Sequence, residues 1–305
     1  MEARLYVDGK DAYTTYGVYV QLSGWNELIA MPPLKTVSYN DWQEEDGVEA
    51  DLSAPVLDSR EVTINFACCE ADSGYFDLIE CLSDGAYHTF DCPHIGRTFR
   101  LRLIGVETFT FNGELGDITM KFGDDFPLNG YRYESPISTL PTDDRYAIDD
   151  VPLSQYGVRI LRGTLSEITK TADVKTNLLR NITTRQGAVY DPETVTYKSK
   201  DVRLSCLMTA ETLDALWHNY DALLYDLIRP DERKLWVGDL ERNFPCYYKS
   251  CQVSDFFPDD GKAWLQFSLT VTFTQDFRIT DNSRVLATED DIVVVTENQE
   301  YAIEL

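Results

Sequence analysis

The sequence repeats itself at a spacing of 140 residues, and no other feature constrains the fold as strongly. Residues 6–18, YVDGKDAYTTYGV, align with residues 146–158, YAIDDVPLSQYGV, through a shared Tyr-Gly-Val. The same spacing then aligns three further stretches without a gap: Leu34-Lys35-Thr36 with Val174-Lys175-Thr176, Gly47 with Gly187, and Arg60-Glu61-Val62 with Lys200-Asp201-Val202. Solenoid units are only about 20–50 residues long, so this period predicts two duplicated domains.

The chain length and a shift in the spacing give the predicted domain boundaries. The 305 residues are about twice the usual size of a domain. Near the end of each copy Phe122 aligns with Phe273, which implies a net insertion of 11 residues in the second copy. We predict a first domain at 1–130, a linker at 131–145, a second domain at 146–280 and an acidic C-terminal extension at 281–305. A strand-like run at 292–295 either pairs with a neighbouring subunit's sheet edge or belongs to a self-packed tail.

Each copy is predicted to contain several strands and one helix. Alternating apolar and polar residues in EVTINFAC (61–68) and DVRLSCLM (201–208) predict a half-buried strand in each copy. Apolar residues at helical spacing predict a helix at 213–227 and a shorter helix at about 74–82. The predicted fold class is therefore mainly β: two tandem copies of an antiparallel sandwich or barrel, each flanked by a helix.

The closing strands of the first copy are expected at 98–104, 107–111 and 117–122, with Asn112-Gly113 as a tight hairpin turn between the last two. In the second copy the corresponding strands are expected at 246–253 and 264–273.

Charge and cysteine content limit the kinds of partner. The chain has 52 acidic and 27 basic residues and a net charge of −25, and an acidic surface repels nucleic acid. Seven cysteines without a Cys-x-x-Cys spacing form no disulfide framework, so Cys68 and Cys206 are expected to be core residues in a reducing compartment. The N-terminus has no signal-peptide pattern and no apolar run reaches membrane length, so we expect cytosolic synthesis and no membrane partner.

The sequence lacks the short motifs of the common catalytic classes. It has no glycine-rich phosphate loop, no Gly-x-Ser-x-Gly and no His-Glu-x-x-His. Of the three histidines only His94 lies close to a cysteine, Cys92, and this single pair beside Pro93 is expected to be a turn rather than a zinc site. We therefore expect no enzyme activity, no cofactor and no metal.

Two long polar segments, 35–60 and 175–200, are the best candidates for an interaction site. Each has a glycine near its middle, in the tripeptides Glu-Asp-Gly and Arg-Gln-Gly, which suit hairpin tips. A tryptophan in the first polar segment indicates contact with another chain or, equally, a local packing role. The predicted subunit-interface residues are Trp42, Glu45, Asp46, Gly47, Arg185, Gln186 and Gly187.

The order of elements resembles the tail-tube module of bacteriophage tails and related injection machines. The resemblance covers about residues 1–280 and is carried by the hairpins at 35–60 and 175–200, the single helix and the closing strands. It implies a ring of six modules whose sheets line a channel and whose hairpins reach a neighbouring subunit or the next ring. A chain with two modules would then form a trimeric, pseudo-hexameric ring. The resemblance further implies a structural tail protein (tube, distal tail or hub) that is made in the host cytoplasm, contacts other tail proteins, and meets DNA only as passing cargo.

Two other function classes fit a tandem β protein. A carbohydrate-binding or adhesin module would expose aromatic side chains on one sheet face and remain monomeric. A hydrolase would need two carboxylates at a defined separation beside a groove, and no choice among 52 acidic residues is supported by spacing.

Overall fold

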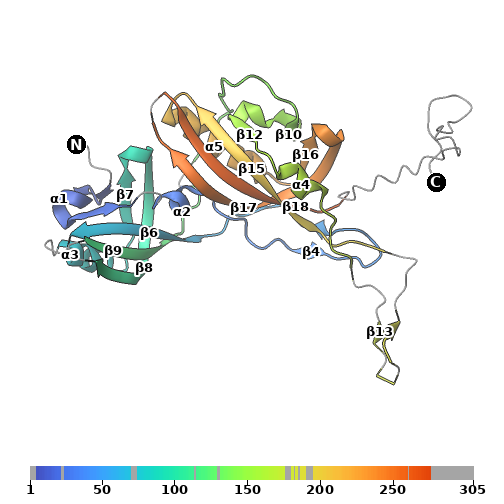
Figure 1. Cartoon of the computed structure of the whole chain (residues 1–305), viewed down its shortest axis with the longest axis horizontal. Helices are drawn as coiled ribbons and strands as arrows, with labels where there is room; N and C mark the ends of the chain where they lie inside the picture. Colours follow the sequence, from blue (N-terminus) through green and yellow to red (C-terminus); the bar gives the residue numbers. More distant parts are fainter. Residues whose placement is uncertain are drawn as a thin grey trace, which may run out of the picture.

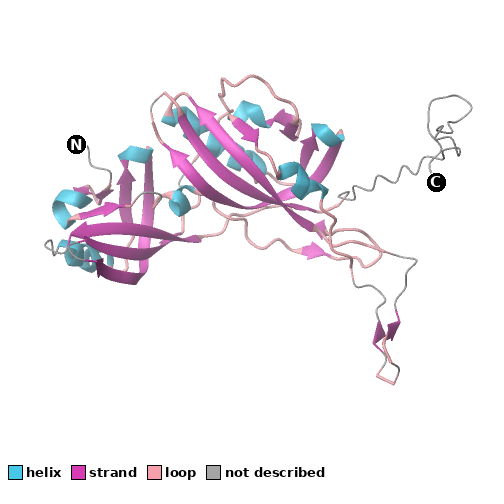
Figure 2. Ribbon diagram, viewed as in Figure 1, coloured by secondary structure: helices cyan, strands magenta, loops and turns pink. Residues whose placement is uncertain are grey.

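The computed structural model shows an elongated molecule with two β-rich bodies (Figures 1 and 2). The residues that it describes are 5–21, 24–69, 74–112, 115–128, 131–175, 180–181, 183–184, 186–189, 195–259 and 261–275. We call residues 5–128 the first half and residues 131–275 the second half. The predicted extension at 281–305 and the predicted tip residue Arg185 lie outside the described residues.

Each half contains a seven-stranded antiparallel sheet, so the chain is mainly β as predicted. In spatial order the first sheet consists of β2 (Lys10–Asp11), β1 (Tyr6–Val7), β7 (His88–Cys92), β8 (Arg97–Asn112), β9 (Leu115–Asp124), β6 (Arg60–Cys69) and β3 (Val18–Val20). The second consists of β11 (Val151–Pro152), β10 (Tyr146–Ile148), β16 (Arg233–Val237), β17 (Arg242–Phe257), β18 (Ala263–Phe273), β15 (Lys200–Ala210) and β12 (Val158–Ile160). The two orders correspond strand for strand, while the predicted domain boundaries stay predictions.

The core strands follow the alternation seen in the sequence. Successive side chains of a strand point to opposite faces, so every second residue faces the core. The core-facing residues of β6 and β15 are at most 1% exposed: Val62, Ile64, Phe66, Cys68, Val202, Leu204, Cys206 and Met208. One face of each sheet is thereby committed to the hydrophobic core.

Helix α3 (Gly74–Leu82) and helix α5 (Leu213–Leu227) form where the apolar spacing predicts them. Thr212 caps α5 by accepting a hydrogen bond from the amide of Ala215. The structure adds short helical turns that sequence periodicity cannot reveal, because a stretch of three to six residues spans less than two turns. These are α1 (Ala12–Tyr16), α2 (Asn26–Ile29), α4 (Thr164–Thr169), η1 (Pro93–Ile95), η2 (Leu153–Tyr156) and η3 (Gly238–Leu240). No helix among the described residues is long and apolar enough to span a membrane.

Strand β8 differs from the prediction because it is continuous. The predicted break between 104 and 107 is instead a pair of register shifts, at Leu103/Gly105 and Val106/Thr108. A bulge adds a residue to one strand while the pairing with its neighbour continues, so the apolar alternation slips without ending the strand. Strand β17 has two register shifts of the same kind, at Tyr248/Ser250 and Val253/Asp255.

Both predicted hairpins form, but they lie differently. The first hairpin, residues 35–60, contains β4 (Tyr39–Asn40) and β5 (Glu49–Ala50) and runs along the second half (Figure 1). The second hairpin, residues 175–200, contains β13 (Arg180–Asn181) and β14 (Ala188–Val189), and its tip projects away from both sheets (Figure 1).

Candidate functional site: the seam between the two halves

The tip of the first hairpin is held by a buried lysine of the second half. Lys175 is 2% exposed, and its ammonium group donates to the carbonyl oxygens of Trp42 and Gly47, both at 2.7 Å. The same nitrogen lies 2.6 Å from the Asp41 carboxylate. A buried ammonium group is costly unless its donors find acceptors, and here all three acceptors come from the hairpin tip. The Lys175 contact therefore locks the first hairpin onto the second half.

Further hydrogen bonds fix the position of the tip. The amide of Gly47 donates to the Tyr197 carbonyl at 2.7 Å, and the amide of Tyr197 donates to the Asp46 carboxylate at 2.9 Å. The Thr196 hydroxyl donates to the Gln43 carbonyl at 2.8 Å. Gly47 has φ +71°, in the left-handed region that glycine adopts without strain, which explains the glycine at this turn.

The structure places the predicted interface residues in different environments. Asp46 and Gly47 contact the second half of the same chain. The carbonyl of Trp42 accepts from Lys175. The residue is 52% exposed, and its indole donates to Glu49 at 3.3 Å. Glu45, Gln186 and Gly187 are exposed in the described part of the chain, and Arg185 lies outside it.

Sequence reasoning did not identify Lys175, Thr196 and Tyr197 as site residues. The available signal was the alignment of Lys35 with Lys175, a basic residue kept at the base of both polar segments.

The segment between α2 and the first hairpin continues this seam. The Tyr220 hydroxyl donates to the Ile29 carbonyl at 3.0 Å, and the Tyr248 hydroxyl donates to the Pro32 carbonyl at 2.8 Å. The amide of Leu34 donates to a carbonyl of β17 at 3.0 Å. Both tyrosines are buried, so the first half is bound to the second through apolar packing as well as polar contacts.

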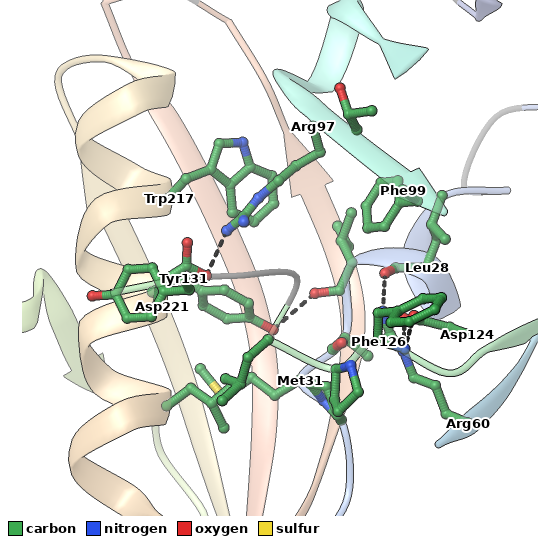
Figure 3. Close-up of a pocket in the computed structure, with 18 of the residues that line it drawn as sticks. Leu28, Met31, Arg60, Arg97, Phe99, Asp124, Phe126, Tyr131, Trp217 and Asp221 are labelled. Carbon is green, nitrogen blue, oxygen red and sulfur yellow. Dashed lines mark hydrogen bonds and ion pairs between the residues drawn. The ribbon is translucent and has the colours of Figure 1, made fainter. Parts of the chain in front are cut away.

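On the other side of the seam, α5 of the second half packs against the first half (Figure 3). Arg97, at the start of β8, lies 2.7 Å from the Asp221 carboxylate and 4.3 Å from the ring centre of Trp217. The Trp217 indole donates to the Ile95 carbonyl at 2.6 Å. The cavity between these groups measures about 90 Å³, whereas pockets for small molecules are typically about 300–1,000 Å³. This cavity is therefore best explained as a gap in a packed interface.

One cluster in the first half has the ligand types of a metal site. Single ligand atoms of Asp8, Cys81 and His88 all lie within 4.8 Å of one another. His88 contacts the Asp8 carboxylate at 2.7 Å, and the amide of Thr89 donates to the same carboxylate at 2.8 Å.

The second half repeats this arrangement with an arginine. Asp149 has φ +49°, as does Asp8, and its carboxylate accepts from Arg233 and from the amide of Lys234. Arginine is not a metal ligand, so we interpret the Asp8–His88 contact as an ion pair that ties a turn to the adjacent strand. Burial by itself lowers the pKa of His88, but its hydrogen bonds to Asp8 and Asp84 outweigh that effect, and the pKa is raised.

A second polar contact also recurs in both halves. Arg60, at the start of β6, donates to the Leu28 carbonyl at 2.7 Å. Lys200, at the start of β15, donates to the Ile168 carbonyl at 2.6 Å. In both cases a basic side chain binds carbonyl groups at the end of a short helix, and burial lowers the pKa of Lys200 to about 8.

Comparisons with known proteins give no match by sequence and a weak structural likeness. No family model matches the sequence, and a search of curated proteins finds no match. One solved structure that aligns is the crystal structure of the phage SPP1 Dit (gp 19.1) protein, described as a paradigm of the hub adsorption apparatus in phages that infect Gram-positive hosts. The alignment has a TM-score of 0.31 and 12% sequence identity, and covers 88% of this chain and 98% of that chain.

Proposed function

We propose that the chain is a non-enzymatic structural subunit of a phage or phage-like tail, and that three copies form a pseudo-hexameric ring. The observation that carries the proposal is the docking of the first hairpin on the second half through Lys175, Asp46 and Gly47. Two bodies with the same strand order are joined head to tail by this contact. A head-to-tail contact that is repeated between copies produces either a closed ring or an open filament.

The charge of the chain supports a conduit role. A net charge of −25 per chain disfavours binding to the phosphate backbone, so DNA would pass the wall of the ring without adhering to it. In this role the chain is a tube, distal tail or hub protein of the virion tail, and its remaining partners are other tail proteins.

Native mass measurement and electron microscopy test the proposal. Purified protein at high concentration is expected to show a species of three times 34.8 kDa and rings with six similar bodies around a pore. A protein that stays monomeric at all concentrations, with no rings in images, would contradict the proposal. A glycan-binding signal from that monomer would favour the carbohydrate-binding class instead.

A further inference from the structure

We propose that the tip of the second hairpin binds a ready-made acceptor around Lys35 in the first half of the next copy of this chain. The inference rests on the proposed ring and identifies the two surfaces that would close it. It depends on the first half having the same acceptor frame as the second half, on Lys35 and Val56 of that frame being exposed, and on the second tip being exposed.

We call the backbone pairing at the base of each hairpin, which in the second half receives the first tip, the acceptor frame. This frame is the same in both halves. In the second half, Lys175 donates its backbone amide to the Thr196 carbonyl at 2.8 Å, beside the bridge between Val174 and Tyr197. In the first half, Lys35 donates its amide to the Val56 carbonyl at 2.8 Å, beside the bridge between Leu34 and Leu57. Each of the four first-half residues, Leu34, Lys35, Val56 and Leu57, lies 140 residues before its counterpart in the second half. Lys35 therefore occupies the place in the first half that Lys175 occupies in the second.

The two frames differ in what covers them. The second-half frame lies beneath the first hairpin, and Lys175 and Thr196 are 2% and 4% exposed. In the first half Lys35 is exposed and Val56 is 55% exposed. An exposed valine beside an exposed lysine, in a frame that is covered in its counterpart, is the surface expected for a contact made by another copy.

The second hairpin tip has the matching geometry and lacks a partner surface in the described part of the chain. Gly187 has φ +78°, close to the +71° of Gly47. Gly47 is buried where the first tip contacts the second half, whereas Thr183, Gln186 and Gly187 are exposed. The second tip has a neutral amide, Gln186, at the position where the first tip has the carboxylate of Asp46. The amide oxygen of Gln186 can still accept a backbone hydrogen bond, but it supplies no carboxylate, so the contact between copies would be weaker than the one within the chain.

The helices are consistent with the same direction of assembly. Within the chain, α5 of the second half packs against η1 of the first half, through Trp217 and the Ile95 carbonyl. The equivalent contact between copies would place α3 of one first half against η3 of the preceding second half. Helix α3 carries Phe76, which is 55% exposed. The hairpin contact and the α3–η3 contact would join the same two halves, so they can belong to one interface between copies.

Cysteine pairs test the proposed contact in the full chain. Thr196 and Gln43 touch within the chain, so Gln43→Cys with Thr196→Cys should form an internal disulfide under mild oxidation. The matched pair Val56→Cys with Thr183→Cys, at the equivalent positions, should instead link separate copies into dimers and closed trimers on non-reducing gels. Each single variant controls for the free cysteines already present.

A second variant separates assembly from folding. Lys35→Ala removes an exposed side chain, so the monomer should unfold at the same temperature as the unaltered protein. The concentration at half-assembly should rise about tenfold or more. If rings form while the Val56/Thr183 pair gives no intermolecular link and Lys35→Ala assembles normally, this contact is wrong and the proposed ring stands. If no variant and no wild-type sample assembles, both proposals fail.

Discussion

At the scale of single residues, the buried polar contacts keep their geometry between the halves while the residue types change. Asp8 pairs with His88 in the first half, and Asp149 pairs with Arg233 in the second. At the end of a short helix, the first half has the guanidinium group of Arg60 where the second half has the ammonium group of Lys200. A catalytic or metal site would restrict the side-chain chemistry, whereas a structural contact of this kind can be made by any basic side chain whose donors reach the same acceptors. These recurring contacts therefore support a scaffold role.

The Asp8–His88 pair predicts a pH dependence that the equivalent Asp149–Arg233 pair lacks. The folded pKa of His88 is raised above its ordinary 6.5, so its stabilising contribution is complete below 6.5 and is lost as the pH rises through the raised value. The pKa of Asp8 is lowered, so its contribution is lost only in acid, as the pH falls through a value below 3.8. Thermal unfolding followed between pH 6 and pH 7.5, below the value of about 8 to which burial lowers the pKa of Lys200, should show a falling midpoint.

Replacing His88 by arginine, the residue that the second half has at the equivalent position, provides the control for this effect. His88→Arg keeps a positive charge throughout the range, so its unfolding midpoint should change much less between pH 6 and pH 7.5. Equal slopes for the wild type and His88→Arg would show that another group causes the pH dependence.

Lys175 provides a second prediction at this scale. Lys175→Met removes a buried ammonium group with three acceptors and should lower the free energy of unfolding by roughly 2–3 kcal/mol, a typical value for hydrogen bonds to a charged group. The equivalent exposed residue is the matched control, and Lys35→Met should change the stability of the monomer by less than about 0.5 kcal/mol. Urea unfolding of both variants at low protein concentration measures the difference, and equal losses would refute the asymmetry between the frames.

At the scale of elements, the sequence predicts long periodic segments well and short or irregular ones poorly. The alternation in β6 and β15 and the apolar spacing in α5 each extend over enough residues to reveal a period. Strands β7 and β16 have five residues each and were not predicted. The glycines locate both hairpin tips, but the docking of the first tip depends on Lys175, more than a hundred residues away, which local pattern cannot supply.

The two tip glycines give the prediction at this scale. Both have positive φ, so alanine at either position introduces a similar backbone strain of roughly 1–2 kcal/mol. The first tip is docked, and therefore Gly47→Ala should lower the free energy of unfolding by about that amount. Gly187→Ala should leave unfolding of the monomer unchanged, because no contact in the described part of the chain holds this exposed tip in the left-handed conformation and the backbone can relax out of it. Denaturant melts of the two variants compare them directly, and a destabilising Gly187→Ala would mean that the second tip is already docked within the chain.

At the scale of the whole molecule, charge opposes the proposed assembly. Each chain carries −25, and a trimer concentrates three times that charge in one particle. Like charges repel over about 30 Å at 0.01 M salt but only over about 3 Å at 1 M. The proposed contact between copies involves a lysine and neutral acceptors, so salt screens mainly the repulsion.

Ring formation should consequently become stronger with salt. Sedimentation at increasing NaCl concentration should show the half-assembly point moving to lower protein concentration, because the repulsion between acidic copies is progressively screened. A neutral osmolyte at equal osmolality controls for water activity and should have a smaller effect. Assembly that weakens as salt rises would indicate that ion pairs dominate the interface between copies, since screening would then remove attraction rather than repulsion. The neutral acceptors of the second hairpin tip could then not be its main component.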